Sequence, residues 1–305
     1  MSPDEHAADE PAAAAAAGAT DAAAAAAGAT DAAAAAAGAT NPAAAAGATD
    51  AAAIEQLFPA AGPGPLDDDA LLALYGREAR HPSPTTADGW VRVNFVSSLD
   101  GSATAEGVSG GLGGPADLRV FDLLRRLADV VLVAAGTVRN EGYGPMRLHD
   151  ADVAWRRARD LPDHPAFAIV SGSLALDAAS RVFTEAPVRP VVLTHAEAPA
   201  DRRAALAAVA DVVDCGADAV DVAVVRRALV ERGLAQIHCE GGPGLLGALV
   251  AADAVDELCL TVSPVLEGGD GPRIARGGAG QGLRSMRLAH VLRAGDMLLT
   301  RYRRP

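Results

Sequence analysis

The sequence predicts an α/β protein with a mainly parallel central sheet flanked by helices, preceded by a disordered tail. Short apolar runs typical of buried strands alternate with segments whose apolar residues recur at helical spacing. Two strand-like segments at the end of the chain, joined by Ala294-Gly295, predict a closing hairpin of antiparallel strands. The tail is predicted because the first fifty residues repeat a ten-residue unit that has no large apolar side chain.

The repeat begins at Asp21 and again at Asp31, each time as Asp-(Ala)6-Gly-Ala-Thr. Such a unit buries too little surface to offset the entropy of ordering it, so we expect residues 1–53 to be disordered. A short helix over Asp67–Tyr75 and a Pro-rich linker are expected within 54–84. A single domain is then expected over 85–305.

The domain is expected to begin with the strand Trp90–Ser97, because apolar and polar residues alternate there. A proline in the first turn predicts a helix over Pro115–Leu127. The continuous apolar run Asp129–Ala135 is typical of a fully buried strand. The elements expected after it are buried strands in Ala166–Ser171 and Pro190–Thr194, a helix over about 200–210, a short strand at Val212-Val213, a helix over 218–232, a strand closing near Ile237, a helix containing Leu245 and Leu249, a strand over Glu257–Ser263, and the hairpin of 284–293 and 296–304.

An apolar segment that stops at Glu240 and turns through Gly241-Gly242 is the first candidate site. Glycines let a backbone approach a ligand closely, and the N-terminus of the following helix favours phosphate. Gly242-x-Gly244-x-x-Gly247 matches the dinucleotide fingerprint, although a tight turn with packing glycines produces the same pattern. A Rossmann fold needs this motif after the first strand and a carboxylate about 20 residues later. Here the motif comes late and no carboxylate follows at that distance, which excludes the Rossmann arrangement.

Small or polar residues also end the other predicted strands, at Ser97–Gly101, Ala135–Thr137 and Ser171. In an open α/β sheet, ligands bind in the crevice at the carboxyl ends of the strands. These strand ends together indicate a ligand site there.

Composition excludes several classes of function. A net charge of −13 argues against nucleic-acid binding, and no apolar run is long enough for a membrane span. The chain has no lysine, which excludes P-loop ATPases and Schiff-base enzymes. No spacing of metal ligands is present, and the zinc-deaminase pattern is missing. Cys215, Cys239 and Cys259 are expected to be buried free thiols in a reducing cytoplasm.

Five motifs occur in an order that resembles the reductase domain of bacterial riboflavin-biosynthesis deaminase–reductases, a family with the dihydrofolate-reductase-like fold. The resemblance spans about residues 90–303 and is nearest to stand-alone pyrimidine reductases, since the deaminase half is missing. The motifs are Val93–Gly101 (VNFVSSLDG), Leu124–Asp129 (LRRLAD), Gly136–Gly144 (GTVRNEGYG), Glu240–Pro243 (EGGP) and Val255–Leu258 (VDEL).

The resemblance implies NADPH-dependent reduction of 5-amino-6-(5-phosphoribosylamino)uracil to its ribitylamino product, with hydride passed to the sugar C1′. It implies that Ser109, Arg125 and Glu240 contact the substrate, that Arg147 is a second phosphate ligand, and that Glu240 or a water supplies the proton. The residues that it assigns to the cofactor are Val96, Gly111, Thr137, Glu141, Ser171, Gly241, Gly242, Pro243, Gly244, Leu245, Leu246 and Gly247. Two of these depart from the family, which commonly has Asp in place of Glu141 and, in many bifunctional members, Trp in place of Gly111.

Several alternatives stay open on the sequence alone. Arg125 could be a solvated helix charge and Glu240 a surface carboxylate, while His238 is expected to be a satisfied core histidine. The Arg-rich end, Arg301–Arg304, is expected to be an edge strand with solvated charges.

Two rival functions also stay open: a reductase of the same fold acting on dihydrofolate or another pterin, and a non-catalytic NADPH-binding sensor or scaffold. The family implies a homodimer. The choice of NADPH over NADH is left open, with Arg139 or the Arg202-Arg203 pair as the candidates for a 2′-phosphate.

Overall fold

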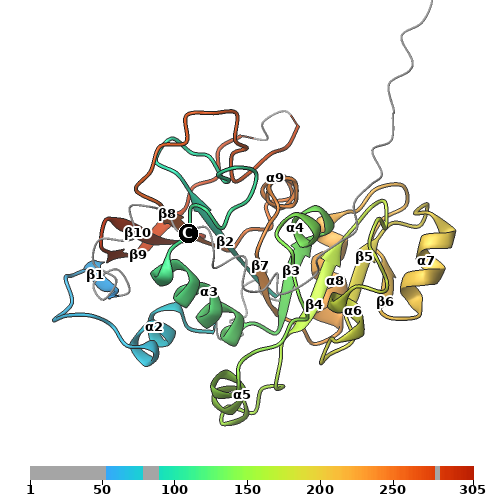
Figure 1. The fold of residues 1–305 in the computed structure, drawn as a ribbon, viewed down its shortest axis with the longest axis horizontal. Helices are drawn as coiled ribbons and strands as arrows, with labels where there is room; N and C mark the ends of the chain where they lie inside the picture. Colours follow the sequence, from blue (N-terminus) through green and yellow to red (C-terminus); the bar gives the residue numbers. More distant parts are fainter. Residues whose placement is uncertain (1–52, 78–88, 279–281) are drawn as a thin grey trace, which may run out of the picture. The chain divides into compact units, whose positions relative to one another are not determined.

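The computed structural model describes residues 53–77, 89–278 and 282–305 (Figure 1). The predicted disordered tail, apart from residue 53, and most of the Pro-rich linker therefore lie outside the described residues. Among the described residues, no helix is long and apolar enough to cross a membrane.

The expected sheet is present and mainly parallel at its centre. Its ten strands are ordered β1-β9-β10-β8-β2-β7-β3-β4-β5-β6. Pairing is parallel from β8 through β6 and antiparallel among β8, β10, β9 and β1. The strands are β1 Glu55–Phe58, β2 Trp90–Ser97, β3 Val130–Ala134, β4 Ala166–Val170, β5 Val191–Thr194, β6 Asp211–Asp214, β7 Gln236–Cys239, β8 Glu257–Val262, β9 Arg287–Ala294 and β10 Met297–Arg303. The predicted α/β class and the closing hairpin are confirmed.

Helices pack on both faces of the parallel strands. The helices are α2 Asp68–Tyr75, α3 Pro115–Leu127, α4 Ala135–Asn140, α5 Asp150–Arg157, α6 Arg181–Thr184, α7 Ala200–Ala207, α8 Val222–Glu231 and α9 Pro243–Ala251. Leu229 of α8 and Leu249 of α9 belong to the buried core on one face. The cores on the other face include Val138 of α4 and Leu206 of α7, and farther along the sheet Leu124 of α3 (Figure 1).

Four short elements were not predicted: β1, α4, α5 and α6. Strand β1 has only four residues and joins the sheet through β9, where Glu55 lies opposite Arg293. Helix α5 buries only Asp152 and Arg156, so its sequence shows no apolar stripe. Elements of four to eight residues contain too few repeats for hydrophobic periodicity to identify them securely.

The prediction of an edge strand with solvated charges at Arg301–Arg304 is wrong, because β10 lies between β9 and β8 and Arg301 belongs to a buried ion cluster. The Glu257 side chain is 0% exposed and lies between Arg92 and Arg301. Arg92 Nε donates to Glu257 Oε1 at 2.5 Å, and Arg301 Nη2 donates to Oε2 at 2.8 Å. The two arginines also donate to the carbonyl oxygens of Tyr75 and Leu74, at 2.7 and 2.6 Å. The cluster thereby joins the C-terminal end of α2 to strands β2, β8 and β10.

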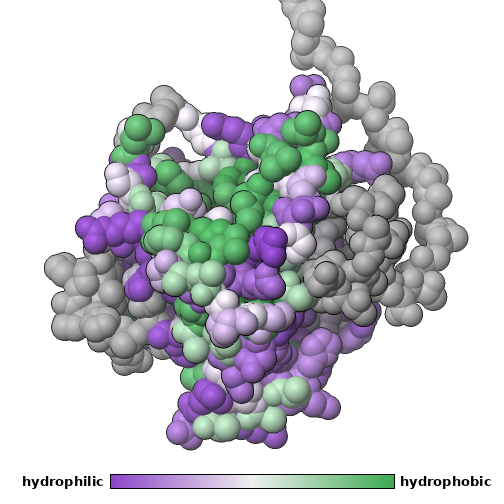
Figure 2. All heavy atoms as spheres, turned by 90° about the vertical axis from the view of Figure 1, so that its left-hand side faces the viewer, coloured by the Kyte–Doolittle hydropathy of each residue, from purple (hydrophilic) through white to green (hydrophobic). Residues whose placement is uncertain are grey.

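The antiparallel end of the sheet leaves one side open. The row Phe58–Val291–Thr300–Leu260 crosses four paired strands, and all its members are exposed or half-buried. Leu298, 38% exposed, lies on the same side in the next row. Figure 2 shows apolar residues gathered on the side of the molecule that carries β1, β9 and β10. At the two edges of the sheet, β6 exposes Asp211 and Asp214, and β1 is short and irregular in register.

Candidate functional site

The glycine turn follows β7 in the middle of the sheet, between β2 and β3. The Gly241 carbonyl oxygen accepts a hydrogen bond from the Ala134 N–H at 2.8 Å, which holds the turn against the end of β3. A Cβ atom at Gly242 would lie 2.6 Å from Thr137 Oγ1, so only glycine fits beside that hydroxyl. The structure thus brings Thr137 and Gly242 together, as two parts of one strand-end cradle.

Glu240 lies immediately before this turn and is paired with Arg125 of α3. Arg125 Nε donates to Oε1 at 2.6 Å and Nη2 to Oε2 at 2.8 Å, and the Tyr143 hydroxyl donates to Oε2 at 2.9 Å. The Glu240 side chain is fully buried, and that of Arg125 is 21% exposed. The guanidinium lies 4.2 Å from the ring centroid of Phe121. Neither residue is therefore the solvated surface charge that the sequence left as an alternative.

The electrostatics of this cluster keep Glu240 ionised. Burial alone would raise the pKa of the carboxyl, but the charge and hydrogen bonds of Arg125 outweigh burial and lower it. For Arg125, burial opposes the charge and Glu240 raises the pKa above its usual value. Burial and then Glu240 raise the pKa of Tyr143, so its hydroxyl stays a donor. An ionised carboxylate has no proton to donate, but it can accept hydrogen bonds and so orient a substrate. Of the two predicted proton sources, Glu240 and water, this favours water.

His238 lies behind this pair on β7, with Nε2 3.5 Å from Glu240 Oε1. It is buried as expected, yet neither ring nitrogen has a hydrogen-bond partner among the described residues. Burial lowers its pKa to about 4, so the imidazole is neutral at physiological pH. The prediction of a satisfied core histidine is therefore wrong in one respect, since the ring is packed but not hydrogen-bonded.

Arg125 keeps one donor for a ligand. Its Nη1 has no hydrogen bond within the described ranges, whereas Nε and Nη2 are both held by Glu240. Each Glu240 oxygen has two lone pairs, so the carboxylate can accept a further N–H as well. The pair therefore offers a donor and an acceptor at one place.

Ser109 and Glu141 are joined by a hydrogen bond. The Ser109 N–H donates to Glu141 Oε1 at 2.9 Å, which ties the loop before α3 to the end of α4. A Cβ atom at Gly111 would lie 3.1 Å from the Ala105 Cβ, so this loop has little room for a larger side chain.

The remaining predicted residues are more scattered. Arg147 is exposed and donates to the Glu185 carbonyl oxygen at 3.2 Å, near α6. Val96 lies on β2 opposite Thr261 of β8. Ser171 follows β4 and is buried. Within the described residues, no hydrogen bond or ion pair joins any of these three to the Arg125–Glu240 pair.

The residues of the glycine fingerprint differ in their roles: some are required by packing and others are open to a ligand. Leu245 and Leu246 pack in the core, so only their backbone is available to a ligand. A Cβ atom at Gly247 would lie 1.8 Å from the Arg276 carbonyl oxygen, so this glycine is required by packing. Gly244 faces open space, and no side chain caps the N-terminus that Pro243 begins. The N–H groups of the first turn of α9 therefore fit a phosphate group.

Orphaned polar atoms support the same fit farther along the sheet. Ser171 Oγ, Thr194 Oγ1 and His195 Nδ1 are buried without a hydrogen-bond partner in the described part of the chain. They follow or end β4 and β5, at the same carboxyl edge as the glycine turn. The residues present thus fit a dinucleotide cofactor laid across the strand ends. In the same ranges, no group of three or more His, Cys, Asp or Glu could hold a metal ion.

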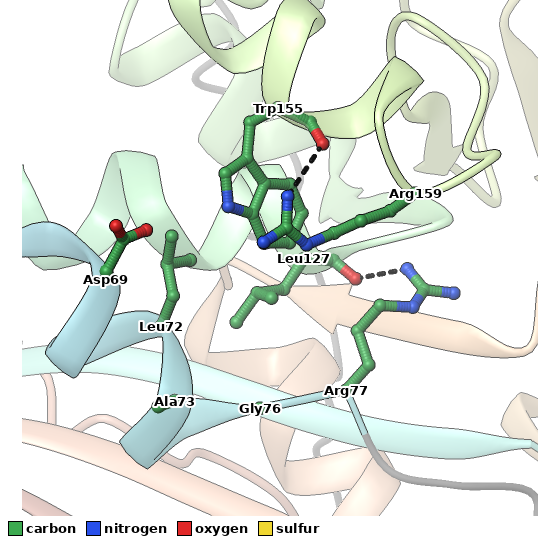
Figure 3. Close-up of a pocket in the computed structure, with 8 residues that line it drawn as sticks. All are labelled: Asp69, Leu72, Ala73, Gly76, Arg77, Leu127, Trp155 and Arg159. Atoms are coloured by element: carbon green, nitrogen blue, oxygen red, sulfur yellow. Dashed lines mark hydrogen bonds between the residues drawn. The ribbon is translucent and has the colours of Figure 1, made fainter.

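A pocket of about 430 Å³ lies elsewhere, among α2, α3 and α5 (Figure 3). Leu127 and Arg77 line it, and Arg77 binds Asp129 just before β3 begins. The pocket is therefore at the amino end of the strands, opposite to the glycine turn.

The sequence analysis did not identify Tyr143 as a partner of Glu240. The only signal for Tyr143 in the sequence is a large aromatic residue between Gly142 and Gly144.

The sequence is similar to a known protein family and to two named reductases. The family model described as RibD C-terminal domain matches residues 89–300. A 2,5-diamino-6-ribosylamino-4(3H)-pyrimidinone 5′-phosphate reductase from Archaeoglobus fulgidus is 26% identical over 210 residues, which are 68% of this chain and 94% of the relative. A relative of the same name from Methanothermobacter thermautotrophicus is 31% identical over 193 residues, 63% of this chain and 85% of the relative.

Solved structures share the fold. A pyrimidine reductase-like protein from Corynebacterium diphtheriae has a TM-score of 0.67 at 27% identity, covering 76% of this chain and 97% of that one. The riboflavin biosynthesis reductase Rib7 from Saccharomyces cerevisiae has a TM-score of 0.56 at 17% identity, with coverage of 76% and 97%.

Proposed function

The chain belongs to the RibD C-terminal domain family, and from this premise we propose that it is a riboflavin-biosynthesis reductase using NADPH. Its substrate class is a ribosylaminopyrimidine 5′-phosphate, and the sequence resemblance favours 5-amino-6-(5-phosphoribosylamino)uracil. The two curated relatives are named for the 2,5-diamino pyrimidinone instead. The observation that carries the proposal is the buried Arg125–Glu240–Tyr143 cluster directly beside the glycine turn.

The chain's own residues position the substrate. Arg125 Nη1 is free to bind a phosphate or carbonyl oxygen, and Glu240 accepts an N–H of the pyrimidine. Arg147 becomes a second phosphate ligand by leaving the Glu185 carbonyl, to which it makes one hydrogen bond. Ser109 places its loop near the same edge through Glu141. These contacts orient the sugar while water supplies the proton.

The cofactor is held at the strand ends. Thr137, Gly241, Gly242 and the N–H groups of Gly244 and Leu245 in the first turn of α9 form the cradle for its pyrophosphate. When bound, NADPH supplies the hydride that reduces the sugar carbon. We place this reaction in the cytoplasm, since Cys215, Cys239 and Cys259 are all buried free thiols.

A steady-state assay tests the function. The purified full chain should oxidise NADPH with the uracil or the 2,5-diamino pyrimidinone substrate, and the product should carry a ribityl chain by mass spectrometry. The ratio of kcat/KM for the two pyrimidines then identifies the physiological substrate. Turnover of dihydrofolate alone would overturn the proposal, and so would tight NADPH binding with no turnover of either pyrimidine.

We further propose that two chains pair through the open apolar face around Phe58, Leu260 and Leu298. Contiguous exposed apolar surface of this kind marks association sites. A Phe58→Arg, Leu298→Arg variant should shift the molar mass measured by light scattering from dimer to monomer, because it places charges in the interface. Leu118→Arg, at an exposed position on α3, is the control and should stay dimeric. A monomeric wild-type protein would contradict this prediction.

A further inference from the structure

The pocket at the amino end of the strands is separate from the site at the glycine turn. Its volume of about 430 Å³ is usual for a small-molecule site, and it lies among α2, α3 and α5 (Figure 3). Leu127, which lines it, is the last residue of α3, and Arg125 lies two residues earlier on the same helix. A molecule bound in this pocket therefore contacts the helix that carries Arg125.

The inside of the pocket is apolar and includes an aromatic ring. Leu72 comes from α2, Leu127 from α3 and Trp155 from α5, and Figure 3 shows these three side chains pointing toward one another. The guanidinium carbon of Arg159 lies 3.9 Å from the centroid of the Trp155 ring. An aromatic ring packs well against an indole and leucine side chains, so the walls favour a flat ligand.

Two guanidinium groups line the pocket. Arg77 donates through Nη2 to Asp129 Oδ1 at 2.6 Å and through Nη1 to the Leu127 carbonyl oxygen, and its Nε makes no hydrogen bond within the described ranges. Arg159 is exposed and donates through Nη1 to the Trp155 carbonyl oxygen at 3.2 Å. No carboxylate among the described residues pairs with Arg159, so its charge is open to an anion.

A third guanidinium adds positive charge next to Arg77. Arg156 is 0% exposed, and its hydrogen bonds go to the carbonyl oxygens of Arg126, Ala128 and Pro162. Its Nη2 has no partner in the described part of the chain. Burial and then the charge of Arg77 lower the pKa of Arg156 to about 10, which leaves it charged at neutral pH. Because buried charges are normally paired, this side of the pocket favours an anion.

A carboxylate lies on the opposite side of the pocket. Figure 3 shows Asp69 of α2 across the pocket from Arg77. The Asp69 side chain is exposed and makes no hydrogen bond or ion pair to another described residue. An ionised carboxylate only accepts hydrogen bonds, so the ligand needs a donor at this end.

We infer that this pocket binds an aromatic carboxylate of two fused rings that carries a hydroxyl or amino group at the end away from its charge. Arg77 and Arg159 bind the carboxylate through charge-assisted hydrogen bonds, and Asp69 accepts from the hydroxyl or amino group. The rings lie against Leu72 and Trp155. The inference does not depend on the proposed function, because these residues belong neither to the Arg125–Glu240 pair nor to the glycine turn.

Three naphthalene compounds test the inference by isothermal titration calorimetry on the full chain. One carries both groups (6-hydroxy-2-naphthoate), one lacks the hydroxyl (2-naphthoate) and one lacks the carboxylate (2-naphthol). The first should bind with a dissociation constant below about 1 mM. Loss of the carboxylate should weaken binding about 10-fold and loss of the hydroxyl about 3-fold. Saturating NADPH should leave the constants unchanged, since its proposed cradle is at the other end of the strands.

Variants place the binding in this pocket. Arg159→Ala should weaken 6-hydroxy-2-naphthoate about 10-fold and leave 2-naphthol unchanged, which shows that the apolar walls are intact. Asp69→Ala should bind 6-hydroxy-2-naphthoate and 2-naphthoate equally. The control is Arg157→Ala, an exposed arginine on α5 whose partner is Asp163, and it should keep the wild-type constants.

Three results would each overturn the inference. They are a dissociation constant for 6-hydroxy-2-naphthoate above about 1 mM, displacement of this compound by NADPH, and wild-type affinity in Arg159→Ala. The pyrimidine assay reports separately on the proposed function. A protein that binds the naphthoates as expected but reduces no pyrimidine would support this pocket and refute that function.

Discussion

Replacing Arg125 by methionine is expected to lower kcat/KM for the pyrimidine about 100-fold, a loss of about 2.7 kcal/mol in transition-state stabilisation. The same change should lower the free energy of unfolding by about 3 kcal/mol, because it leaves the Glu240 carboxylate buried without its cation. The first effect is measured by steady-state kinetics with saturating NADPH. The second is measured by urea denaturation.

The chain offers a matched control on the same helix. Arg119 is bound to Asp68 at 2.6 Å, but the two side chains are 30% and 47% exposed. Arg119→Met should therefore change stability by less than about 1 kcal/mol and leave kcat/KM unaltered. Glu240→Gln together with Arg125→Met completes a double-mutant cycle, and we expect the double variant to be more stable than Arg125→Met alone. Wild-type kinetics in Arg125→Met would show that Arg125 does not bind the substrate.

Replacing Glu257 by glutamine should destabilise the fold more than any surface change. It leaves Arg92 and Arg301, both 5% exposed, without their shared carboxylate. Loss of one partner from a buried ion cluster lowers the free energy of unfolding by about 4 kcal/mol. In a chain of this size that corresponds to a fall in Tm of about 10 °C. Glu55→Gln is the control, since Glu55 and Arg293 form an exposed pair, and its Tm should stay within about 2 °C of wild type.

Glu257 also predicts that the free energy of unfolding falls as the pH is lowered. Burial opposes its charge, but the two arginines lower the pKa of Glu257 to about 2. The stabilisation is therefore complete above the unfolded pKa of about 4.3 and is lost as the pH falls toward 2. Wild type should lose stability more steeply than Glu257→Gln across that interval. Equal slopes for the two proteins would mean that Glu257 is not ionised in the folded state.

The sequence predicted elements whose pattern is local. Strand Trp90–Ser97 and helix Pro115–Leu127 have the predicted bounds, because alternation and a first-turn proline are read from neighbouring residues. Arg301 was misjudged because Glu257, the carboxylate that it shares with Arg92, is close to both arginines only after three strands have paired. Tyr143 was missed because Glu240, its hydrogen-bond partner, is distant in the sequence and close only in the folded chain. Arg125 and Glu240 were identified through the resemblance, but their pairing with each other could be seen only in the structure.

The two outermost strands restrict how this protein can assemble. A sheet edge with free N–H and C=O groups is a template for another strand, but β6 places two aspartates there and β1 is too short and irregular to serve. Strand-by-strand growth into a fibril is therefore blocked at both ends of the ten-stranded sheet. In the dimer that we propose, a two-fold axis brings the open apolar face of one chain onto the same face of the other. No copy of that face is then left over to bind a third chain.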